Sequence, residues 1–457
     1  MKTKQAIAVL IIGLGLLAAS VSRAATITAT GSGNWTSTIP DAPWPGGIVP
    51  QTTDNAEIDT PFNVSVDSTA TIDYIFGTGT VTMTKNSTLN IVGTDAGEGT
   101  QSLATLDTSA TNNTVNYEGN AFWCKHQNYY NLVLGGFGTL YNGEIGVSGD
   151  GAAAMTIAGN LTLGGTANVQ QAASFTVNGN MIVGPGSTFD ASCSPVTVLG
   201  NTIVSGTLVD FCGQSAAQDD VLNNVAVTPG GKWHLQDVVE WAITGNLTNH
   251  GDISGFGFSS ITFNGTGVIA GDPLTIPTLT INGSSTIATT VTVTTNTPGL
   301  NGTLVFDLAH KGEMIVPSFL GQQLFFGGTL DVVNTGAAPT PGFTYQLFLA
   351  SGYNDPFSFG TINLPTLPGA LTWVNNLTTS GSLSVSGVST PTITPSFSGN
   401  LWTLSWDSGT FPGYSVQGQT NANGIRNNWG ETGSGTVSPF LTTISTNNPS
   451  VFFRLHQ

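Results

Sequence analysis

The sequence contains little charge, and positive charge is the scarcer sign. Of its 457 residues, 9 are Lys or Arg and 26 are Asp or Glu, which gives a formal net charge of −17. Charged residues make up 8% of the chain, whereas an average soluble domain has roughly 25%. Because binding to a nucleic-acid backbone requires Lys and Arg to neutralise phosphates, a nucleic-acid partner is excluded.

Strong helix formers are also under-represented. The 59 glycines, with many Thr, Ser and Asn residues, outnumber the Glu, Lys, Ala and Leu that favour helices. Apolar residues nevertheless make up 39% of the chain and alternate with polar ones, which is not typical of a disordered chain. These features predict a large all-β protein.

The first 24 residues have the pattern of a secretory signal peptide. Lys2 and Lys4 precede an apolar run over 6–19, and Ser22-Arg23-Ala24 places small residues at the −3 and −1 positions. The run is shorter than the roughly 20 residues of a membrane-spanning helix. We therefore expect cleavage after Ala24 and export of a chain without a transmembrane segment, to the cell surface or the extracellular medium.

Cysteine is nearly absent, with three residues in the chain. An oxidising compartment permits a disulfide. Cys193 and Cys212 are the favoured pair because their separation is close to one turn of the repeat described next. We interpret the third, Cys124, as a buried small side chain rather than as a catalytic thiol beside His126.

An internal repeat organises the middle of the chain. The pattern Asn-apolar-x-apolar recurs at intervals of 29, 20, 21, 23 and 22 residues, and glycine precedes the Asn in four of the six copies. The copies begin at Asn131, Asn160, Asn180, Asn201, Asn224 and Asn246. A period near 20–23 with short strand-like segments is typical of a three-sided parallel β-helix, whose turns stack about 4.8 Å apart.

The residue types within the repeat fit this architecture. Gly followed by Asn suits a bend, and stacked Asn side chains can hydrogen-bond from turn to turn. Segments such as Leu161-Thr162-Leu163 direct alternate side chains inward and outward. A leucine-rich repeat would require a different consensus, and a β-sandwich would lack the 21-residue recurrence. We predict a right-handed parallel β-helix.

The remaining segments are expected to surround this β-helix. The prediction comprises a signal peptide over 1–24, the β-helix with its N-terminal cap over 25–298, a β-rich cap over 299–388, a linker over 389–395, and a small antiparallel β-sandwich-like module over 396–457. At the observed period, the second segment holds roughly twelve turns. Trp35 and Trp44 are expected to cover its first turn.

Three segments resemble known sequences. The run Phe263–Gly271, with Leu279–Asn282, resembles a repeat of secreted bacterial β-helix proteins. Residues 302–385 resemble the cap that closes autotransporter passenger domains. The last 60 residues, which include Phe452-Phe453-Arg454-Leu455, are similar to a C-terminal module of secreted proteins from Verrucomicrobia-type bacteria. The resemblance implies an adhesin-like β-helix outside the cell.

Enzymatic activity is the alternative, because parallel β-helices also carry polysaccharide-active enzymes. Glycosidase chemistry requires two acids about 5–9.5 Å apart. Asp190 and Asp210 are separated by about one turn and are therefore the weak catalytic candidates, although we interpret them as solvent-facing acids at strand edges. A lyase would also need a cation, and Lys232 is the single Lys or Arg between Lys125 and Lys311.

Carbohydrate binding without cleavage is a third hypothesis. Aromatic side chains can stack on sugar rings, although packing within the turns is the other role open to them. The aromatic candidates are Trp123, Tyr129, Tyr130, Tyr141, Trp233 and Trp241. No cofactor and no metal site is predicted, and the expected partner is a polysaccharide or a cell-envelope component. The leading interpretation is a structural or adhesin-like protein without catalytic activity.

Overall fold

The computed structural model describes residues 25–456, apart from 94–102, 120–124, 126, 137–142, 146–153, 172–173, 192–194, 211–218, 237–238, 256, 258, 295–297, 311, 317–326, 351–352, 354–358, 369–370, 388–390, 410, 412, 433–437, 446 and 449. It is 55% strand and 2% helix, which confirms the all-β prediction. Within the described residues, no helix has the length and hydrophobicity needed to cross a membrane.

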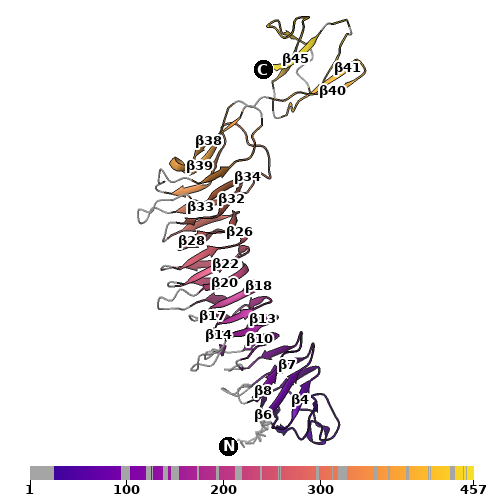
Figure 1. Ribbon diagram of the computed structural model, residues 1–457, viewed down its shortest axis with the longest axis vertical. Helices are drawn as coiled ribbons and strands as arrows, with labels where there is room; N and C mark the ends of the chain where they lie inside the picture. Colours follow the sequence, from indigo (N-terminus) through magenta and orange to yellow (C-terminus); the bar gives the residue numbers. More distant parts are fainter. Residues whose placement is uncertain are drawn as a thin grey trace, which may run out of the picture. The chain divides into compact units, whose positions relative to one another are not determined.

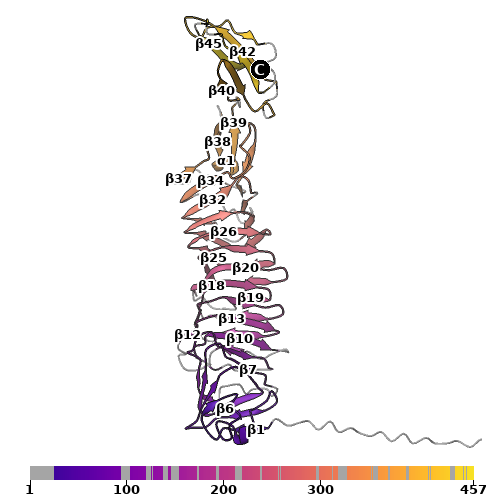
Figure 2. The same ribbon diagram turned by 90° about the vertical axis from the view of Figure 1, so that its right-hand side faces the viewer.

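The strands form a parallel β-solenoid of about ten turns, as the repeat predicted. Figures 1 and 2 show strands from successive turns stacked as rungs. The turns are fewer than the roughly twelve expected because some are long: Thr88 pairs with Thr114 in the next turn, and Leu132 pairs with Leu161. The chain divides into two compact units, residues 1–169 and 170–457, each described separately below.

Most strands of unit 1 belong to two parallel sheets. The first has the order β1-β3-β6-β4-β2, with β8 also paired to β6. The second contains β5, β7, β9, β10 and β13 in successive parallel pairs. The elements of this unit are β1 (Thr26–Thr28), β2 (Gly33–Asn34), η1 (Pro45–Gly47), β3 (Asn55–Glu57), β4 (Asn63–Val66), β5 (Thr69–Ile72), β6 (Tyr74–Met83), β7 (Thr88–Ile91), β8 (Leu103–Asp107), β9 (Thr114–Tyr117), β10 (Asn131–Gly136), β11 (Gly143–Ile145), β12 (Met155–Ile157) and β13 (Leu161–Gly165). Strand β14 (Asn168–Gln171) contains the boundary between the units.

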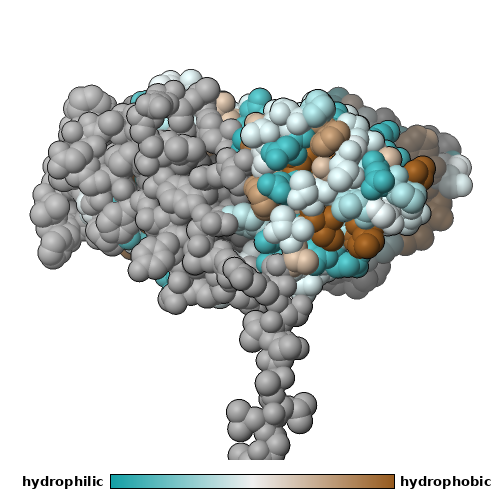
Figure 3. All heavy atoms as spheres, turned by 90° about the horizontal axis from the view of Figure 1, so that it is seen from below, coloured by the Kyte–Doolittle hydropathy of each residue, from teal (hydrophilic) through white to brown (hydrophobic). Residues whose placement is uncertain are grey.

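Two tryptophans are buried near the start of unit 1. The rings of Trp35 and Trp44 meet edge to face, with centroids 5.0 Å apart, and Trp44 Nε1 donates a hydrogen bond to the Trp35 carbonyl at 2.7 Å. The amide of Trp35 in turn donates to the carbonyl of Ser65 in β4. The pair is therefore part of the buried core beside the first strands of unit 1, and its expected capping role stays a prediction. The described surface at the N-terminal end mixes hydrophilic residues with small hydrophobic patches (Figure 3).

Unit 2 begins with three parallel stacks of strands, one for each side of the turn. The first stack is β15 (Phe175–Val177), β18 (Val196–Val204), β20 (Asp219–Val227), β22 (Glu240–Ile243), β25 (Ser260–Phe263), β28 (Thr278–Ile281) and β31 (Gly299–Leu300). The second contains β16 (Met181–Val183), the later halves of β18 and β20, β23 (Leu247–Asn249), β26 (Thr266–Gly271), β29 (Ser284–Ile287), β32 (Thr303–Asp307), β34 (Thr329–Val333) and β37 (Thr361–Asn363). The third contains β17 (Thr188–Asp190), β19 (Thr207–Val209), β21 (Lys232–Leu235) and β24 (Asp252–Gly255), and then β27 (Leu274–Ile276), β30 (Thr290–Val293), β33 (Glu313–Val316) and β36 (Phe348–Ala350).

Strand alternation fills the solenoid interior with apolar side chains. In β25 and β28, Ile261 lies beside Leu279 and Phe263 beside Ile281, and all four are buried. The residues between them, Thr262 and Thr280, face outward. Because full burial of such an apolar side chain contributes about 1.5–3 kcal/mol, the repeated inward positions are the main source of stability.

The Gly-Asn pairs of the repeat form one corner of the solenoid. Asn201 donates its backbone N–H to Asn180 Oδ1 at 2.8 Å, and Asn246 donates its own to Asn224 Oδ1 at 2.9 Å. A side chain on the preceding residue has no room, because a Cβ at Gly245 would lie 2.3 Å from Asn224 Oδ1. Glycine therefore precedes Asn so that the Asn side chain of the previous turn can reach the backbone.

In later turns the same corner, between the first and second stacks, carries these two residues in the reverse order. Asn282 Nδ2 donates to Asn264 Oδ1, and Asn301 Nδ2 donates to Asn282 Oδ1, both at 3.0 Å. Gly265 and Gly283 follow the first two of these asparagines, and their carbonyls accept hydrogen bonds from the next turn at 2.8 Å. The predicted Asn stacking is thus present along one corner of unit 2, first as Gly-Asn and then as Asn-Gly.

Removing one asparagine from a later turn of this corner tests the contribution of the stacking. Asn282→Ala deletes two side-chain hydrogen bonds and is expected to lower the free energy of unfolding by about 1 kcal/mol, the range for exposed bonds. Urea unfolding followed by circular dichroism measures the change. Asn363→Ala is the control, because this exposed asparagine makes no side-chain hydrogen bond within the described residues. An equal effect of both substitutions would contradict the prediction.

The solenoid continues beyond residue 298, into the region expected to lose the repeat. Strand β32 pairs with β34, and β34 pairs with β37, all in parallel. The steps between turns lengthen, since Thr303 pairs with Thr329 and Thr329 with Thr361. Long connections between the strands therefore hide the period in the sequence while the stacking persists.

Antiparallel sheets follow the last turns. One sheet is β35 (Thr344–Gln346), β39 (Ser382–Ser386) and β38 (Thr372–Asn376), with the short helix α1 (Leu377–Ser380) before β39. The C-terminal module contains two further sheets, β40 (Thr394–Ser398), β41 (Leu401–Ser405) and β44 (Phe440–Thr443), and β43 (Gly430–Glu431), β42 (Ser415–Thr420) and β45 (Val451–His456). Leu404, Trp406, Val416 and Phe440 pack together from both sheets, which confirms the sandwich-like module.

Candidate functional site

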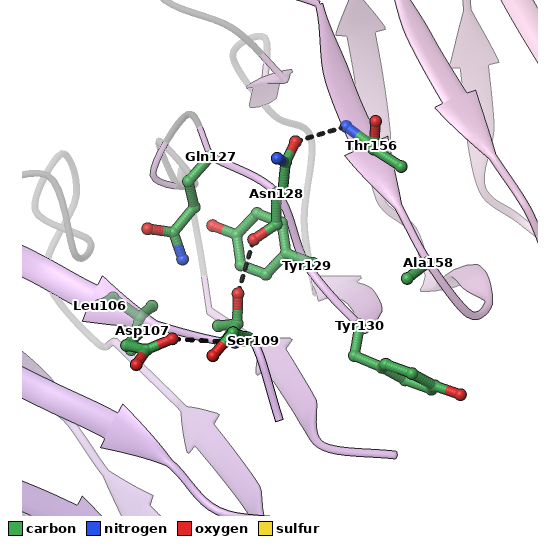
Figure 4. Close-up of a pocket in the computed structure, with 10 residues that line it drawn as sticks. Leu106, Asp107, Ser109, Gln127, Asn128, Tyr129, Tyr130, Thr156 and Ala158 are labelled. Carbon is green, nitrogen blue, oxygen red and sulfur yellow. Dashed lines mark hydrogen bonds between the residues drawn. The ribbon is translucent and has the colours of Figure 1, made fainter. Parts of the chain in front are cut away.

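A groove of about 480 Å³ lies within unit 1. Strand β8 contributes its last residues, the segment before β10 contributes a run of amides and tyrosines, and β12 forms the far wall. The lining residues are Leu106, Asp107, Thr108, Ser109, Gln127, Asn128, Tyr129, Tyr130, Thr156 and Ala158 (Figure 4). The groove therefore combines polar side chains from three consecutive parts of the chain with two aromatic rings.

Hydrogen bonds between turns hold the segment before β10 in place. Thr108 Oγ1 donates to the Asn128 carbonyl at 2.6 Å, and Asn128 Oδ1 accepts from the Thr156 amide at 2.8 Å. The backbone of Tyr129 bonds to Thr156 and Ala158 on the other side, at 3.0 and 2.8 Å. The groove wall is thus a preformed part of the stack.

The two tyrosines in the groove have different roles. Tyr129 is 2% exposed, and its hydroxyl lies 3.1 Å from the Tyr117 hydroxyl and donates to the Lys125 carbonyl at 2.5 Å. Tyr130 is half-buried, and it makes no side-chain hydrogen bond within the described residues. Tyr129 is therefore part of the wall, and Tyr130 offers a ring face to a ligand.

The groove carries one carboxylate and two amides with unused hydrogen-bonding capacity. Asp107 Oδ1 accepts from the Ser109 amide at 3.0 Å, and no described donor reaches Oδ2. Among the described residues, Asn128 is bonded through its Oδ1 but has no partner for its Nδ2, and the buried Gln127 Nε2 has no acceptor. Figure 4 shows the Tyr130 ring at one end of the groove, with the Gln127 and Asp107 side chains at the other.

The cation nearest to this groove in sequence is engaged elsewhere. Lys125 Nζ donates to the Leu103 carbonyl at 2.7 Å, and burial lowers the pKa of this ammonium group. No lysine or arginine is among the residues that line the groove. Its electrostatic character is therefore neutral to negative.

The two catalytic candidates lie in different environments. Asp190, at the end of β17, is in register with Val209 of β19 and is half-buried. Asp210 is the next residue after Val209 and is fully buried, so the interpretation as a solvent-facing acid is wrong for Asp210. Because successive residues of a strand point to opposite sides, the two carboxylates do not converge on one face.

Two of the aromatic candidates are core residues. Trp233 and Trp241 are 0% and 1% exposed, and their rings meet edge to face with centroids 5.3 Å apart. Their indoles therefore pack the interior of unit 2 and present no face to a sugar. Several other predicted positions lie outside the described residues: Trp123, Cys124, Tyr141, and the pair Cys193 and Cys212.

A second hollow, of about 330 Å³ in unit 2, contains a structural carboxylate. Asp307 is 7% exposed and accepts hydrogen bonds from the amides of Ala309 and Thr335, from Thr335 Oγ1, and from His310 Nδ1. Burial alone would raise the pKa of Asp307, but these hydrogen bonds outweigh burial and lower the pKa to about 2. Since Thr335 belongs to the turn after Asp307, the carboxylate fastens two turns together.

The low pKa of Asp307 predicts a loss of stability in acid. A carboxyl whose pKa falls from 3.8 to about 2 on folding stabilises the protein fully above pH 4, and this contribution disappears as the pH falls toward 2. Asp307→Asn is expected to lower the free energy of unfolding at pH 7 by about 2 kcal/mol and to weaken its dependence on pH between 4 and 2. Urea unfolding at several pH values measures both effects.

The control for this experiment is Asp331→Asn. It makes the same change of charge at a position without a side-chain hydrogen bond in the described structure. Its effect on stability is expected to be within about 0.5 kcal/mol, as for other surface substitutions. The same pH profile in wild type and Asp307→Asn would refute the structural role of this carboxylate.

The fold and the groove define the protein as a parallel β-solenoid with a preformed groove on its surface. Comparison with known protein families, with curated proteins and with solved structures gives no match. Tyr129 and Tyr130 were predicted from the sequence as ligand-binding residues, whereas Asp107, Gln127 and Asn128 were not. Gln127 and Asn128 directly precede the two tyrosines in the sequence, and this position could have identified them as neighbours in the same turn.

Proposed function

We propose that this protein is a secreted or cell-surface β-solenoid with a structural, adhesin-like role and no catalytic activity. The observation that carries the proposal is the stack itself, whose interior is packed with apolar side chains and whose turns are joined by Asn stacking along one corner. Such a stack is a stable scaffold, and its outward positions are mostly uncharged Thr, Ser and Asn.

The sequence supports the location of this scaffold outside the cell. Residues 1–24 have the pattern of a signal peptide. The cap-like segment over 302–385 resembles that of autotransporter passenger domains, and the last 60 residues resemble a module of Verrucomicrobia-type secreted proteins. A surface with few charges is also compatible with attachment to polysaccharide or cell-envelope components.

Cell fractionation tests the location. The full chain and a variant without residues 1–24 are produced in a Gram-negative host, and the periplasmic, membrane, cytoplasmic and medium fractions are compared by immunoblot. We expect the full chain to leave the cytoplasm in a shortened form and the truncated variant to stay there. Full-length protein found in the cytoplasm with residues 1–24 attached would overturn the proposal.

A second experiment separates the structural role from the enzymatic alternative. The purified protein is incubated with plant and algal polysaccharides, and new reducing ends are measured. The positions of Asp190 and Asp210 on different sides of their strands do not favour the two-acid mechanism. Chain cleavage that is lost in Asp210→Asn would establish the enzymatic alternative, whereas an absence of cleavage in all samples supports the scaffold.

A further inference from the structure

We infer that the groove of unit 1 binds a neutral oligosaccharide, with one pyranose ring against the face of Tyr130. The inference deepens the proposed function, because it names the class of ligand that the adhesin-like surface recognises. It depends on the groove alone and not on where the protein is located.

The aromatic end of the groove suits the apolar face of a sugar ring. Tyr130 is half-buried, and its backbone carbonyl accepts a hydrogen bond from the Gly159 amide at 2.6 Å, so the residue is fixed in the stack. The neighbouring lining residue Ala158 is exposed and small. A ring can therefore lie on Tyr130 without displacing another side chain, and little conformational entropy is lost on binding.

The polar end of the groove matches the hydroxyl groups of a sugar. A hydroxyl donates one hydrogen bond and accepts others. Among the described residues, no partner occupies Asp107 Oδ2, which can accept, or Nδ2 of the exposed Asn128, which can donate. The two groups can therefore bond to the two roles of a sugar hydroxyl.

Charge selects neutral sugars over acidic ones. The described residues that line the groove include the Asp107 carboxylate and no Lys or Arg, and the net charge of the chain is −17. The carboxylates of a uronic acid polymer would be repelled, with no Lys or Arg to pair with them. With one carboxylate among its lining residues, the groove also lacks the two acids of a glycosidase, so we infer binding without cleavage.

Calorimetric titration with defined oligosaccharides tests the inference. The probes are cellohexaose, laminarihexaose, mannohexaose and, as the acidic comparison, hexagalacturonate. We expect at least one neutral hexasaccharide to bind the full chain with a Kd of about 1 mM or lower, and hexagalacturonate to bind at least about tenfold more weakly.

Substitutions within the groove locate the binding site. Tyr130→Ala is expected to weaken binding about tenfold and Tyr130→Phe about twofold or less, because the ring is kept. Ala158→Phe removes no polar contact and fills the groove, so it keeps the test valid if Tyr130→Ala folds poorly. Phe397→Ala is the matched control, since it removes an aromatic ring that is 74% exposed in the C-terminal module.

The outcomes separate clearly. Loss of binding in Tyr130→Ala and Ala158→Phe, with binding retained in Phe397→Ala, supports the inference. Equal binding by wild type and both groove variants, preference for hexagalacturonate, or no binding of any probe at about 10 mM overturns it. Failure of the fractionation experiment would reject the proposed location and leave these binding results unchanged.

Discussion

Gly283→Ala is expected to lower the free energy of unfolding by about 3 kcal/mol or more, and to prevent stacking of the turns around it. A Cβ at this position would lie 2.0 Å from the Gly265 carbonyl oxygen and 2.8 Å from the backbone of Asn264. The obstructing atoms are backbone, and the Gly265 carbonyl already accepts a hydrogen bond from Ser284. Relief of the clash therefore requires one turn to move relative to the next. The expected loss of stability is at the upper end of the range for overpacking substitutions.

Urea unfolding followed by far-ultraviolet circular dichroism measures this effect. Gly164→Ala is the matched control, because a Cβ there would meet no atom within 4 Å. It is expected to change stability by less than about 1 kcal/mol, in either direction. Similar midpoints for the two variants would show that the corner has room for a side chain and would contradict the account of the repeat given above.

Trp241→Ala is expected to cost about 4 kcal/mol, because it opens a large cavity in the core of unit 2. Trp241 is 1% exposed and pairs edge to face with Trp233, which is fully buried. Truncation to alanine removes both the favourable free energy of burying the indole and its contact with the Trp233 ring. The same denaturation experiment measures the loss, with tryptophan fluorescence as a second probe.

Trp241→Phe distinguishes packing from hydrogen bonding at this position. The Nε1 of Trp241 has no acceptor among the described residues, so its removal breaks no bond seen in this part of the structure. The phenylalanine variant is therefore expected to lose about half as much stability as the alanine variant. A loss below about 1 kcal/mol for alanine would place the indole at the surface and restore it as a candidate sugar-binding ring.

The solenoid could be predicted from sequence because two signals coincide. The Asn repeat sets the turn length, and the alternation in segments such as Leu161-Thr162-Leu163 identifies the strands. The number of turns was overestimated, and the stacking after residue 298 was missed, because long connections shift the spacing while strands such as β34 still pair in register.

The candidate catalytic pair was harder to predict, because the side of the strand on which a side chain lies depends on the strand register to a single residue. Thr188 pairs with Thr207, a step of 19 residues, whereas Asp190 and Asp210 are 20 residues apart in the sequence. That difference of one residue sends the two carboxylates to opposite sides. Trp233 and Trp241 are buried because they occupy inward positions of their strands. Where turn lengths vary, the sequence does not reveal which positions point inward.

The Gly-Asn corner has a consequence for how such a chain can change in evolution. Each turn bonds only to its immediate neighbours, through the same backbone and asparagine contacts at Asn180, Asn201 and Asn224. Duplication or deletion of one complete turn joins equivalent corners and leaves the hydrogen-bonding pattern intact. Gain or loss of a single residue within a strand, by contrast, exchanges the side chains that point inward with those that point outward. The length of the stack can therefore vary between descendants by whole turns, while the sequence of each corner stays constrained.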